Sequence, residues 1–307
     1  VAYGTLTSIS ESPFQFGLLY AGSDDGLVHV TKNGGVNWTN ISNTFPKDLW
    51  VSRVIASEHK KERVYVTLNG YRWDDFKPYI YMSDTYGATW TDISNNLPLS
   101  PVNVIREDPE NENILYLGTD NGAYVSFNQG ATWEPFAAGL PNVAVHDLAV
   151  QKRDKDLVVG THGRSIYVAD ISLLQQLSGT NMNSIVLAEV PAIRASRRWG
   201  STGFNQFGDF YEPAVHLQVY APTSGTAEIS VATEEGMSLK SWKTDVVKGV
   251  NVVDYNVSIS EKGKSALEKN DVTISKADNG SYYLPKGMYT ITVNMNGKST
   301  SQPFEVK

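Results

Sequence analysis

Carboxylate and aromatic side chains gather in short turns of this 307-residue sequence, where a ligand could reach them. The turns read "SDDG" (23–26), "TDNG" (119–122) and "THGR" (161–164), and a longer segment reads "TLNGYRWDDFKPY" (67–79). Flat aromatic rings beside carboxylates suit sugar stacking or a peptide partner. The candidate ligand-binding residues are Asp24, Tyr71, Arg72, Trp73, Asp74, Asp75, Phe76, Asp120, His162 and Arg164.

Each of these candidates also has a purely structural interpretation. Asp-Gly and Asn-Gly pairs are ordinary hairpin turns, which would explain Asp24, Asp25, Asp120 and Asn121 without any ligand. Arg164 could brace its sheet through backbone carbonyls. Trp73 and Phe76 could pack against a neighbouring sheet, because aromatic side chains seek burial. The sequence leaves both interpretations open.

Catalysis has weaker support than binding. A glycosidase needs two carboxylates about 5–9.5 Å apart, and no pair is singled out among the conceivable ones, Asp24, Asp74, Asp75, Asp120 and Asp147. A sialidase-like site needs converging arginines, but the pattern suggests surface roles for several of Arg53, Arg63, Arg72, Arg106, Arg153 and Arg164. Nucleophile-elbow, phosphate-loop, dinucleotide and zinc-protease motifs do not occur. We therefore assign no catalytic residue, and glycoside hydrolase is the enzyme class if this expectation fails.

Composition also bounds the cofactors and partners. The sequence has no cysteine, its five histidines show no paired metal-ligand spacing, and Asp24, Asp25 and Asp120 do not form a known calcium loop. A net charge of −7 argues against a nucleic-acid or anionic-membrane partner. There is no apolar run long enough for a transmembrane helix. We expect no cofactor, no metal, no nucleic acid and no membrane span.

A repeated pattern indicates which elements must position these side chains. Ser/Thr-x-x-x-Gly-x-Thr/Asn-Trp occurs in "HVTKNGGVNWTNIS" (29–42), "YMSDTYGATWTDIS" (81–94) and "YVSFNQGATWEPF" (124–136). The spacing suits a four-stranded propeller blade of ~40–50 residues. Glycine permits a positive φ in the turn, short polar side chains bond nearby backbone, and the tryptophan packs between strands. The residues with this structural role are Thr31, Gly35, Trp38, Ser83, Gly87, Trp90, Ser126, Gly130 and Trp133.

The pattern predicts an all-β chain in three segments. Residues 1–177 hold four blade repeats, of which the fourth (145–172) keeps three strands and lacks the repeated turn. Residues 178–213 read as a linker whose aromatic and basic side chains should cover apolar surface. Residues 214–307 alternate with period two and contain an Asn296-Gly297 hairpin signal, which predicts a small Ig-like β-sandwich. The linker cluster comprises Arg197, Arg198, Trp199, Phe204, Phe207, Phe210 and Tyr211.

The repeated turn resembles the Asp-box, Ser-x-Asp-x-Gly-x-Thr-Trp, of bacterial neuraminidase (BNR) repeats. Here the aspartate position holds Asn33, Thr85 and Asn128, of which Asn imitates the turn bond well and Thr more weakly. "DLVVGTHGRSIYVADIS" and "LPKGMYTITV" resemble the closing blade and the Ig-like end domain of bacterial sortilin-like propeller proteins, so the resemblance covers essentially the whole chain. His162 and Arg164 match that family's motif. The same box also occurs in sialidases and xyloglucan hydrolases.

The resemblance implies an exported, non-catalytic module that binds or scaffolds a glycan or protein ligand. Its expected location is secreted, periplasmic or at the cell surface of a bacterium. The alternative is the C-terminal part of a propeller glycoside hydrolase, sialidase-like or xyloglucanase-like, whose active site needs further blades. Because such proteins generally have more than four blades, the remaining blades are expected on another chain or in a preceding segment.

Overall fold

The computed structural model describes residues 4–136, 139–177, 181–202, 208–270 and 272–307. The chain divides into two units, Val1–Ser178 and Gly179–Lys307, and each has its own hydrophobic core. The described residues are mostly strands and turns, which confirms the predicted all-β fold class. Within those residues, no helix is long and apolar enough to cross a bilayer.

The first unit consists of four antiparallel sheets, here called blades 1 to 4, whose strands follow one another in sequence order. Blade 1 contains β1 (Leu6–Glu11), β2 (Leu19–Ser23), β3 (Val28–Thr31) and β4 (Thr39–Asn40). Blade 2 contains β5 (Trp50–Ala56), β6 (Val64–Gly70), β7 (Asp75–Ser83) and β8 (Thr91–Asp92). Blade 3 contains β9 (Val102–Glu107), β10 (Leu115–Thr119), β11 (Gly122–Ser126) and β12 (Glu134–Pro135). Blade 4 contains β13 (Val145–Gln151), β14 (Asp156–Thr161) and β15 (Ile166–Asp170). A short helix, α1 (Ser172–Gln176), follows. This meander is the architecture of propeller blades, and blade 4 has three strands, as predicted.

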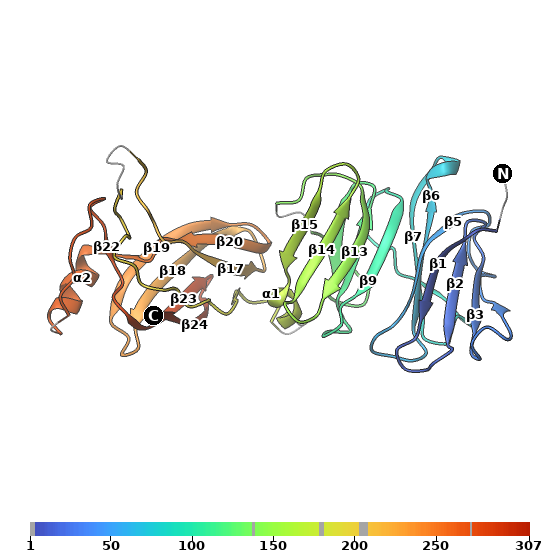
Figure 1. Ribbon diagram of the computed structural model, residues 1–307, viewed down its shortest axis with the longest axis horizontal. Helices are drawn as coiled ribbons and strands as arrows, with labels where there is room; N and C mark the ends of the chain where they lie inside the picture. Colours follow the sequence, from blue (N-terminus) through green and yellow to red (C-terminus); the bar gives the residue numbers. More distant parts are fainter. Residues whose placement is uncertain (1–3, 137–138, 178–180, 203–207, 271) are drawn as a thin grey trace. The chain divides into compact units, whose positions relative to one another are not determined.

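The blades pack face to face in chain order, with β1 beside β5, β5 beside β9 and β9 beside β13 (Figure 1). Between blades 1 and 2 the core includes Tyr20 and Val51, and between blades 2 and 3 it includes Tyr65 and Val102. β6 is buried along its whole length. Each inner blade therefore buries its two faces against two neighbours, as repeat architectures do.

The three repeated turns connect the third and fourth strands of blades 1 to 3. Their central glycines have φ values of 93°, 86° and 85°, in the left-handed region that favours glycine. Each glycine amide donates to the hydroxyl four residues earlier at 2.8–3.0 Å, in the pairs Gly35–Thr31, Gly87–Ser83 and Gly130–Ser126. The backbone turn is thus closed by local side chains.

The tryptophan of a repeated turn reaches back to the preceding blade. Trp90 Nε1 donates to the Ile41 carbonyl at 2.7 Å, and Trp133 Nε1 donates to the Ile93 carbonyl at 2.7 Å. Trp133 is 3% exposed, whereas Trp38, which has no described blade before it, is 43% exposed. The motif is therefore a clamp between blades as well as a local turn.

Both ends of the blade stack expose positions that are buried where a neighbouring blade covers them. Ile9 of β1 is 64% exposed, while Val54 and Ile105, which hold the same register position in blades 2 and 3, are 1% and 0% exposed. At the other end, Val168 of β15 is 62% exposed, while its counterpart Val30 in blade 1 is 6% exposed. The stack is therefore open on both sides.

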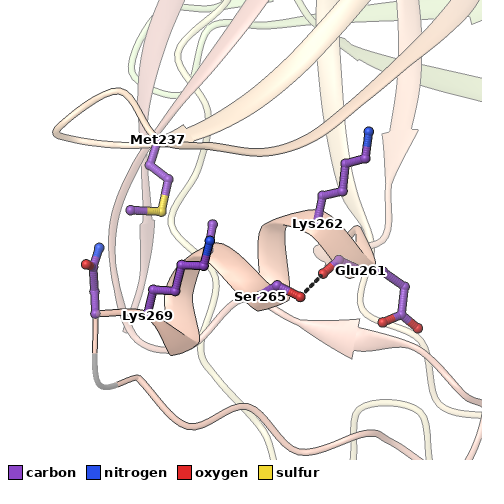
Figure 2. A pocket seen from close by; sticks show the side chains of 7 residues that line it. Met237, Glu261, Lys262, Ser265 and Lys269 are labelled. Carbon is purple, nitrogen blue, oxygen red and sulfur yellow. Dashed lines mark hydrogen bonds between the residues drawn. The ribbon is translucent and has the colours of Figure 1, made fainter.

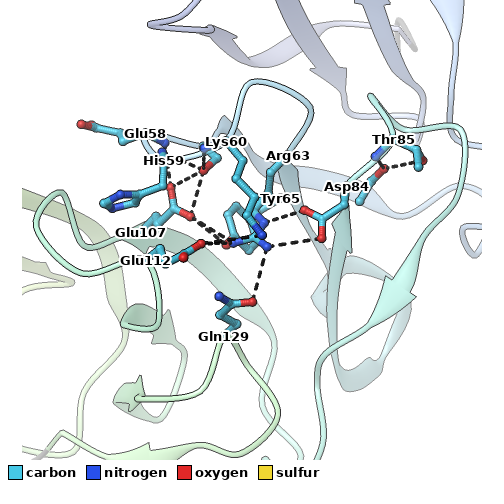
Figure 3. A network of polar contacts seen from close by, with 12 residues as sticks. Glu58, His59, Lys60, Arg63, Tyr65, Asp84, Thr85, Glu107, Glu112 and Gln129 are labelled. Carbon is cyan, nitrogen blue, oxygen red and sulfur yellow. Dashed lines mark hydrogen bonds and ion pairs between the residues drawn. The ribbon is translucent and has the colours of Figure 1, made fainter. Parts of the chain in front are cut away.

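A buried ionic network joins blades 2 and 3 (Figure 3). The Arg63 side chain is 1% exposed, and its Nε donates to Asp84 at 2.6 Å. Its Nη1 lies 3.4 Å from the Glu112 carboxylate and 4.0 Å from that of Glu107. Glu107, which is also buried, accepts a hydrogen bond from the Tyr65 hydroxyl at 2.9 Å. Carboxylates from both blades thus compensate a guanidinium that water does not reach.

The stability of this network should depend on the ionisation of Asp84. The hydrogen bond from Arg63 lowers the pKa of Asp84 below its ordinary value of 3.8, so the folded state binds this proton less readily than the unfolded state does. The stabilisation is present above the unfolded pKa and is lost as pH falls through the folded pKa. We expect acidification from about pH 6 to pH 3 to reduce the free energy of unfolding more in the wild type than in Asp84→Asn. Urea unfolding at a series of pH values measures this, and equal acid sensitivity would contradict it.

Three tyrosines occupy one register position in the second strands but differ in their hydrogen bonds. Tyr65 donates to Glu107 at 2.9 Å and Tyr116 to Asp108 at 2.8 Å, whereas the buried Tyr20 hydroxyl has no partner among the described residues. We expect Tyr65→Phe to lower the free energy of unfolding by about 1–3 kcal/mol, because a buried carboxylate loses a donor. Tyr20→Phe should be neutral or stabilising. Urea unfolding of both variants tests this, and equal losses would refute the contrast.

The second unit is a two-layer sandwich. One sheet contains β16 (Val186–Leu187), β17 (Val215–Ala221) and β20 (Gly249–Tyr255), and the other β18 (Gly225–Thr233), β19 (Ser238–Val246), β23 (Gly287–Met295) and β24 (Lys298–Val306). Accessory elements are β21 (Ser258–Ile259), α2 (Glu261–Glu268) and β22 (Tyr282–Tyr283). The β23–β24 hairpin turns at Asn296 and Gly297, with φ values of 52° and 77°. This is the hairpin that the Asn-Gly pair indicated.

The segment interpreted as a linker contributes to the second unit. Its β16 pairs with β17, and Ile193 forms a parallel bridge with Val306. Trp199 is 7% exposed, and its ring lies 5.8 Å from that of Tyr283. Of the other aromatic residues in the segment, Phe210 and Tyr211 are exposed, and Phe204 and Phe207 lie outside the described residues. Residues here thus complete a sheet and a core.

Candidate functional site

The candidate ligand-binding residues belong to the hairpins that connect the second and third strands of the blades. We call the end of the blades formed by these hairpins the loop face. Because the strands are antiparallel, these hairpins lie at the end of each blade opposite the repeated turns. Beneath them, Asn69 Nδ2 donates to Asn103 Oδ1 at 2.8 Å, and Asn103 Nδ2 donates to Asp120 Oδ1 at 2.8 Å. Asn69 and Asn103 are buried, so blades 2 and 3 are fixed to each other at this face.

The longer segment of blade 2, residues 67–79, is inserted between the second and third strands of the blade. The sequence suggested one exposed loop there, but the structure shows a lengthened hairpin. β6 and β7 remain paired as far as Gly70 and Asp75, and only the 3-10 turn η1 (Tyr71–Trp73) and Asp74 form the tip. Asp74 closes the turn with a φ of 54°. Asp75 accepts from the Tyr79 hydroxyl at 2.8 Å, so its carboxylate serves the strand. Side-chain and backbone bonds have extended the sheet through a segment that looked irregular.

Three exposed aromatic residues lie at or next to the end of this hairpin, Tyr71 and Trp73 in η1 and Phe76 in β7, and we call them the aromatic tip. Their exposures are 61%, 58% and 44%. Trp73 Nε1 donates to the Asp48 carbonyl at 2.9 Å, and the rings of Tyr71 and Phe76 meet edge to face at 6.2 Å. The sequence left open whether Trp73 and Phe76 pack against a neighbouring sheet, and in this unit both rings are exposed. The tip is held in place with its rings accessible.

Trp50, at the start of β5, is a residue of this region that the sequence reasoning missed. The Arg72 guanidinium lies 5.4 Å from the centre of its ring, a cation–π distance. The Trp50 ring is partly buried, and its Nε1 has no hydrogen-bond partner among the described residues. The available signal was the turn "PKDLW" before a strand, which places an indole at the entrance to a blade.

Asp24 and Asp25 have local structural contacts. Asp24 Oδ1 accepts the amides of Gly4 at 2.9 Å and Thr5 at 2.8 Å. Burial alone would raise the pKa of Asp24, but these amide hydrogen bonds hold its pKa below the ordinary value. Asp25 accepts a hydrogen bond from the Ser23 hydroxyl within the same turn. These contacts support the interpretation that Asp24 and Asp25 have a structural role in the hairpin turn.

On blade 4, the structure brings His162 close to a second histidine. The rings of His162 and His146 lie 5.4 Å apart, and both side chains are exposed. The His162 amide donates to the Ala144 carbonyl at 2.9 Å, and Arg164 is exposed on the same hairpin. The contacts of Asp120, described above, lie in blade 3. The candidate residues thus form separate clusters along the loop face, each with its own contacts.

Two of the six arginines considered for a sialidase-like site converge on one carboxylate. Arg53 of β5 and Arg106 of β9 lie 2.9 Å and 3.4 Å from Oδ1 of Asp147 in β13. Burial lowers the pKa of Arg106, and the neighbouring Arg53 adds to this. The first strands of three blades thus share a cluster with two cations and one anion. It could not be found from the sequence, because its members are separated by about one blade each.

The carboxylates that could hold a metal ion are already engaged in other contacts. Asp24, Asp25 and Asp120, the carboxylates considered for calcium, each have the separate partners given above. In the part of the chain that the structure describes, no group of three His, Asp or Glu side chains is arranged to hold a metal ion. We assign no metal ligand among these residues.

The second unit has a hollow of about 500 Å³ beside α2 (Figure 2). Met237 and the side chains of Lys262 and Lys269 line it. The Ser265 hydroxyl, which also lines it, donates to the Glu261 carbonyl at 3.0 Å within the helix. This hollow therefore offers a ligand flexible lysines rather than fixed polar groups.

Comparison with known proteins gives fold-level likeness only. No protein-family model matches the chain, and no curated protein matches its sequence. Similar solved structures include the GH74 xyloglucanase from Xanthomonas campestris (10% identity, 98% of this chain and 47% of that chain, TM-score 0.46). Another is the Niastella koreensis GH74 enzyme (16% identity, 97% of this chain and 49% of that chain, TM-score 0.44). A third is YCF48 from Cyanidioschyzon merolae (16% identity, 73% of this chain and 69% of that chain, TM-score 0.36). The chain spans about half the length of the two GH74 proteins.

Proposed function

We propose that the chain is a non-catalytic β-propeller binding module with an Ig-like end domain, exported by its cell, and that the aromatic tip contacts its ligand. The exposure of Tyr71, Trp73 and Phe76 on one fixed hairpin carries this proposal. Exposed apolar side chains that gather in one patch of a protein surface often mark a site of interaction, whereas single exposed apolar residues do not. Because the hairpin is already ordered, binding costs little conformational entropy.

The chemistry of the tip suits a glycan or a protein segment. Flat rings stack on the apolar face of a sugar or cover a peptide side chain. Arg72 and Asp74 are exposed beside the rings and supply a cationic donor and a carboxylate acceptor. A ligand can therefore gain apolar contact and directional hydrogen bonds from a single hairpin.

Trp73→Ala should abolish or strongly weaken ligand binding without unfolding the protein. Interface aromatics commonly account for 2 kcal/mol or more, roughly thirtyfold in affinity. The measurement is binding of the full chain to a glycan array and to a displayed peptide library. Trp38→Ala removes another exposed tryptophan, at the opposite end of blade 1, and is the matched control. Equal binding by Trp73→Ala and the wild type would refute the role of the tip.

The second candidate is a part of a larger propeller, such as a glycoside hydrolase completed by further blades. The open ends favour it, because Ile9, Trp38 and Val168 are exposed, whereas the counterparts Val54, Trp133 and Val30 are buried. A blade placed before blade 1 would cover Ile9 and offer a carbonyl to Trp38. The partner would then be further blades, on this polypeptide or another.

Hydrolysis and assembly distinguish the two candidates. The hydrolase reading requires cleavage of xyloglucan or of a sialoside by the complex that contains the further blades. It also requires Val168→Asp to prevent that complex from forming, because an uncompensated charge would be buried there. A stable monomer that binds its ligand at full affinity, with no hydrolysis in any complex, would exclude this reading and leave the binding module.

A further inference from the structure

A cavity of about 550 Å³ opens in the second unit, where β19 and β20 meet the segment before β17. Its volume lies within the usual range for small-ligand sites. Its main lining residues are Glu212, Lys240, Trp242, Asp254, Tyr255 and Asn256. All of them belong to the second unit.

An aromatic platform forms one wall of this cavity. The rings of Trp242 and Tyr255 are stacked, with centres 5.2 Å apart and planes inclined by 21°. Tyr255 is 1% exposed, and its hydroxyl donates to the Ser258 carbonyl at 3.0 Å. Tyr255 therefore anchors the stack in the core, while Trp242 is only partly buried and lines the cavity.

A lysine is fixed beside the platform. Lys240 Nζ lies 5.4 Å from the centres of both rings. It donates to Ser258 Oγ at 2.6 Å and to Asn256 Oδ1 at 3.3 Å. An ammonium group has three N–H bonds, so these two acceptors leave one donor for a ligand. Burial lowers the pKa of Lys240, opposed by the charge of Glu212, which indicates a group partly withdrawn from water.

The rim adds acceptors of the opposite charge. Glu212 Oε1 accepts from Asn279 Nδ2 at 3.0 Å, and its Oε2 lies 3.5 Å from Asn256 Nδ2. Asp254 Oδ1 lies 2.6 Å from His216 Nδ1 on the neighbouring strand. The lining thus carries two carboxylates and one ammonium group. Lys240 already occupies the cation position over the rings, and the carboxylates disfavour an anion.

We propose that this cavity binds a neutral pyranose unit of a glycan, with the sugar ring against Trp242. A neutral sugar has an apolar C–H face for the platform and hydroxyls that both donate and accept. Lys240 and Asn256 supply donors, and Glu212 supplies acceptors, around one ring-sized space. The site is additional to the aromatic tip and does not rest on its function.

The test uses the full chain and neutral probe sugars. Cellobiose, maltose and lactose are titrated to about 20 mM, a range that detects millimolar affinity, while NMR follows the tryptophan indole N–H signals. Trp242→Phe identifies the Trp242 signal. We expect that signal to shift with a neutral sugar, and glucuronate and glucosamine to bind at least about tenfold more weakly. Glu212→Gln should weaken neutral-sugar binding about tenfold.

Controls separate this site from the aromatic tip and from unfolding. Glu212 is exposed, so Glu212→Gln should leave the dispersion of the other indole signals unchanged, and a loss of binding then reports the site. Trp73→Ala should leave the Trp242 shift intact even if it abolishes binding to the array. The proposal is overturned if no neutral sugar shifts the Trp242 signal, or if Glu212→Gln binds a neutral sugar as tightly as the wild type does.

Discussion

Arg63→Met is expected to lower the free energy of unfolding by about 3–5 kcal/mol, the usual cost of removing one partner from a buried ion pair. The Arg63 side chain is 1% exposed and fills the seam between blades 2 and 3. Methionine restores much of the volume but none of the charge. Glu107 would remain buried without a cation, so the loss comes chiefly from an uncompensated carboxylate. Urea unfolding followed by tryptophan fluorescence gives the difference.

Two further variants identify the origin of that loss. Arg153→Ala removes an arginine that is 81% exposed and paired with Asp154, so it should leave the free energy of unfolding unchanged within experimental error. Adding Glu107→Gln to Arg63→Met removes the stranded charge and should recover part of the lost stability. If the double variant is less stable than Arg63→Met, packing rather than charge holds the seam.

The sequence predicts those parts of the fold that local chemistry decides. Glycine at the repeated turns, and Asn296-Gly297 at a hairpin, require left-handed backbone, and each has it. The missing fourth strand of blade 4 follows from the missing repeat. The role of residues 181–202 does not follow, because β16 and Trp199 are short signals whose partners lie far along the chain. Only tertiary packing shows that they complete a sheet and a core.

The candidate site divides in the same way. The sequence shows that aromatic residues cluster between residues 67 and 79. Their exposure could not be predicted, because it depends on the paired extension of β6 and β7. The contact of Trp50 with Arg72 could not be predicted from the sequence, because β6 separates the two residues in the chain. The convergence of Arg53 and Arg106 on Asp147 could not be predicted either, since it joins blades whose segments lie about one repeat apart. Sequence spacing within one repeat does not specify which side chains face the next. Sites built across repeats therefore require the structure.

Trp133→Ala should lower the free energy of unfolding by about 3–5 kcal/mol, as large aromatic deletions in cores do. Trp133 is 3% exposed, and its Nε1 donates to the Ile93 carbonyl at 2.7 Å. The variant would leave a cavity between blades 2 and 3 and deprive a buried carbonyl of its donor. Urea unfolding of the full chain measures the loss.

Trp38→Ala changes the same motif position and isolates the contribution of the neighbouring blade. Trp38 is 43% exposed and has no described blade before it, so we expect a loss of less than about 1 kcal/mol. Both tryptophans follow the same Gly-x-x-Trp spacing, so a purely local role would give equal losses and contradict the clamp. A large loss in Trp133→Ala alone would show that the repeated turn stabilises the seam to the preceding blade. The exposed Trp38 would then be the unused half of such a seam, which is the position where a further blade would bind.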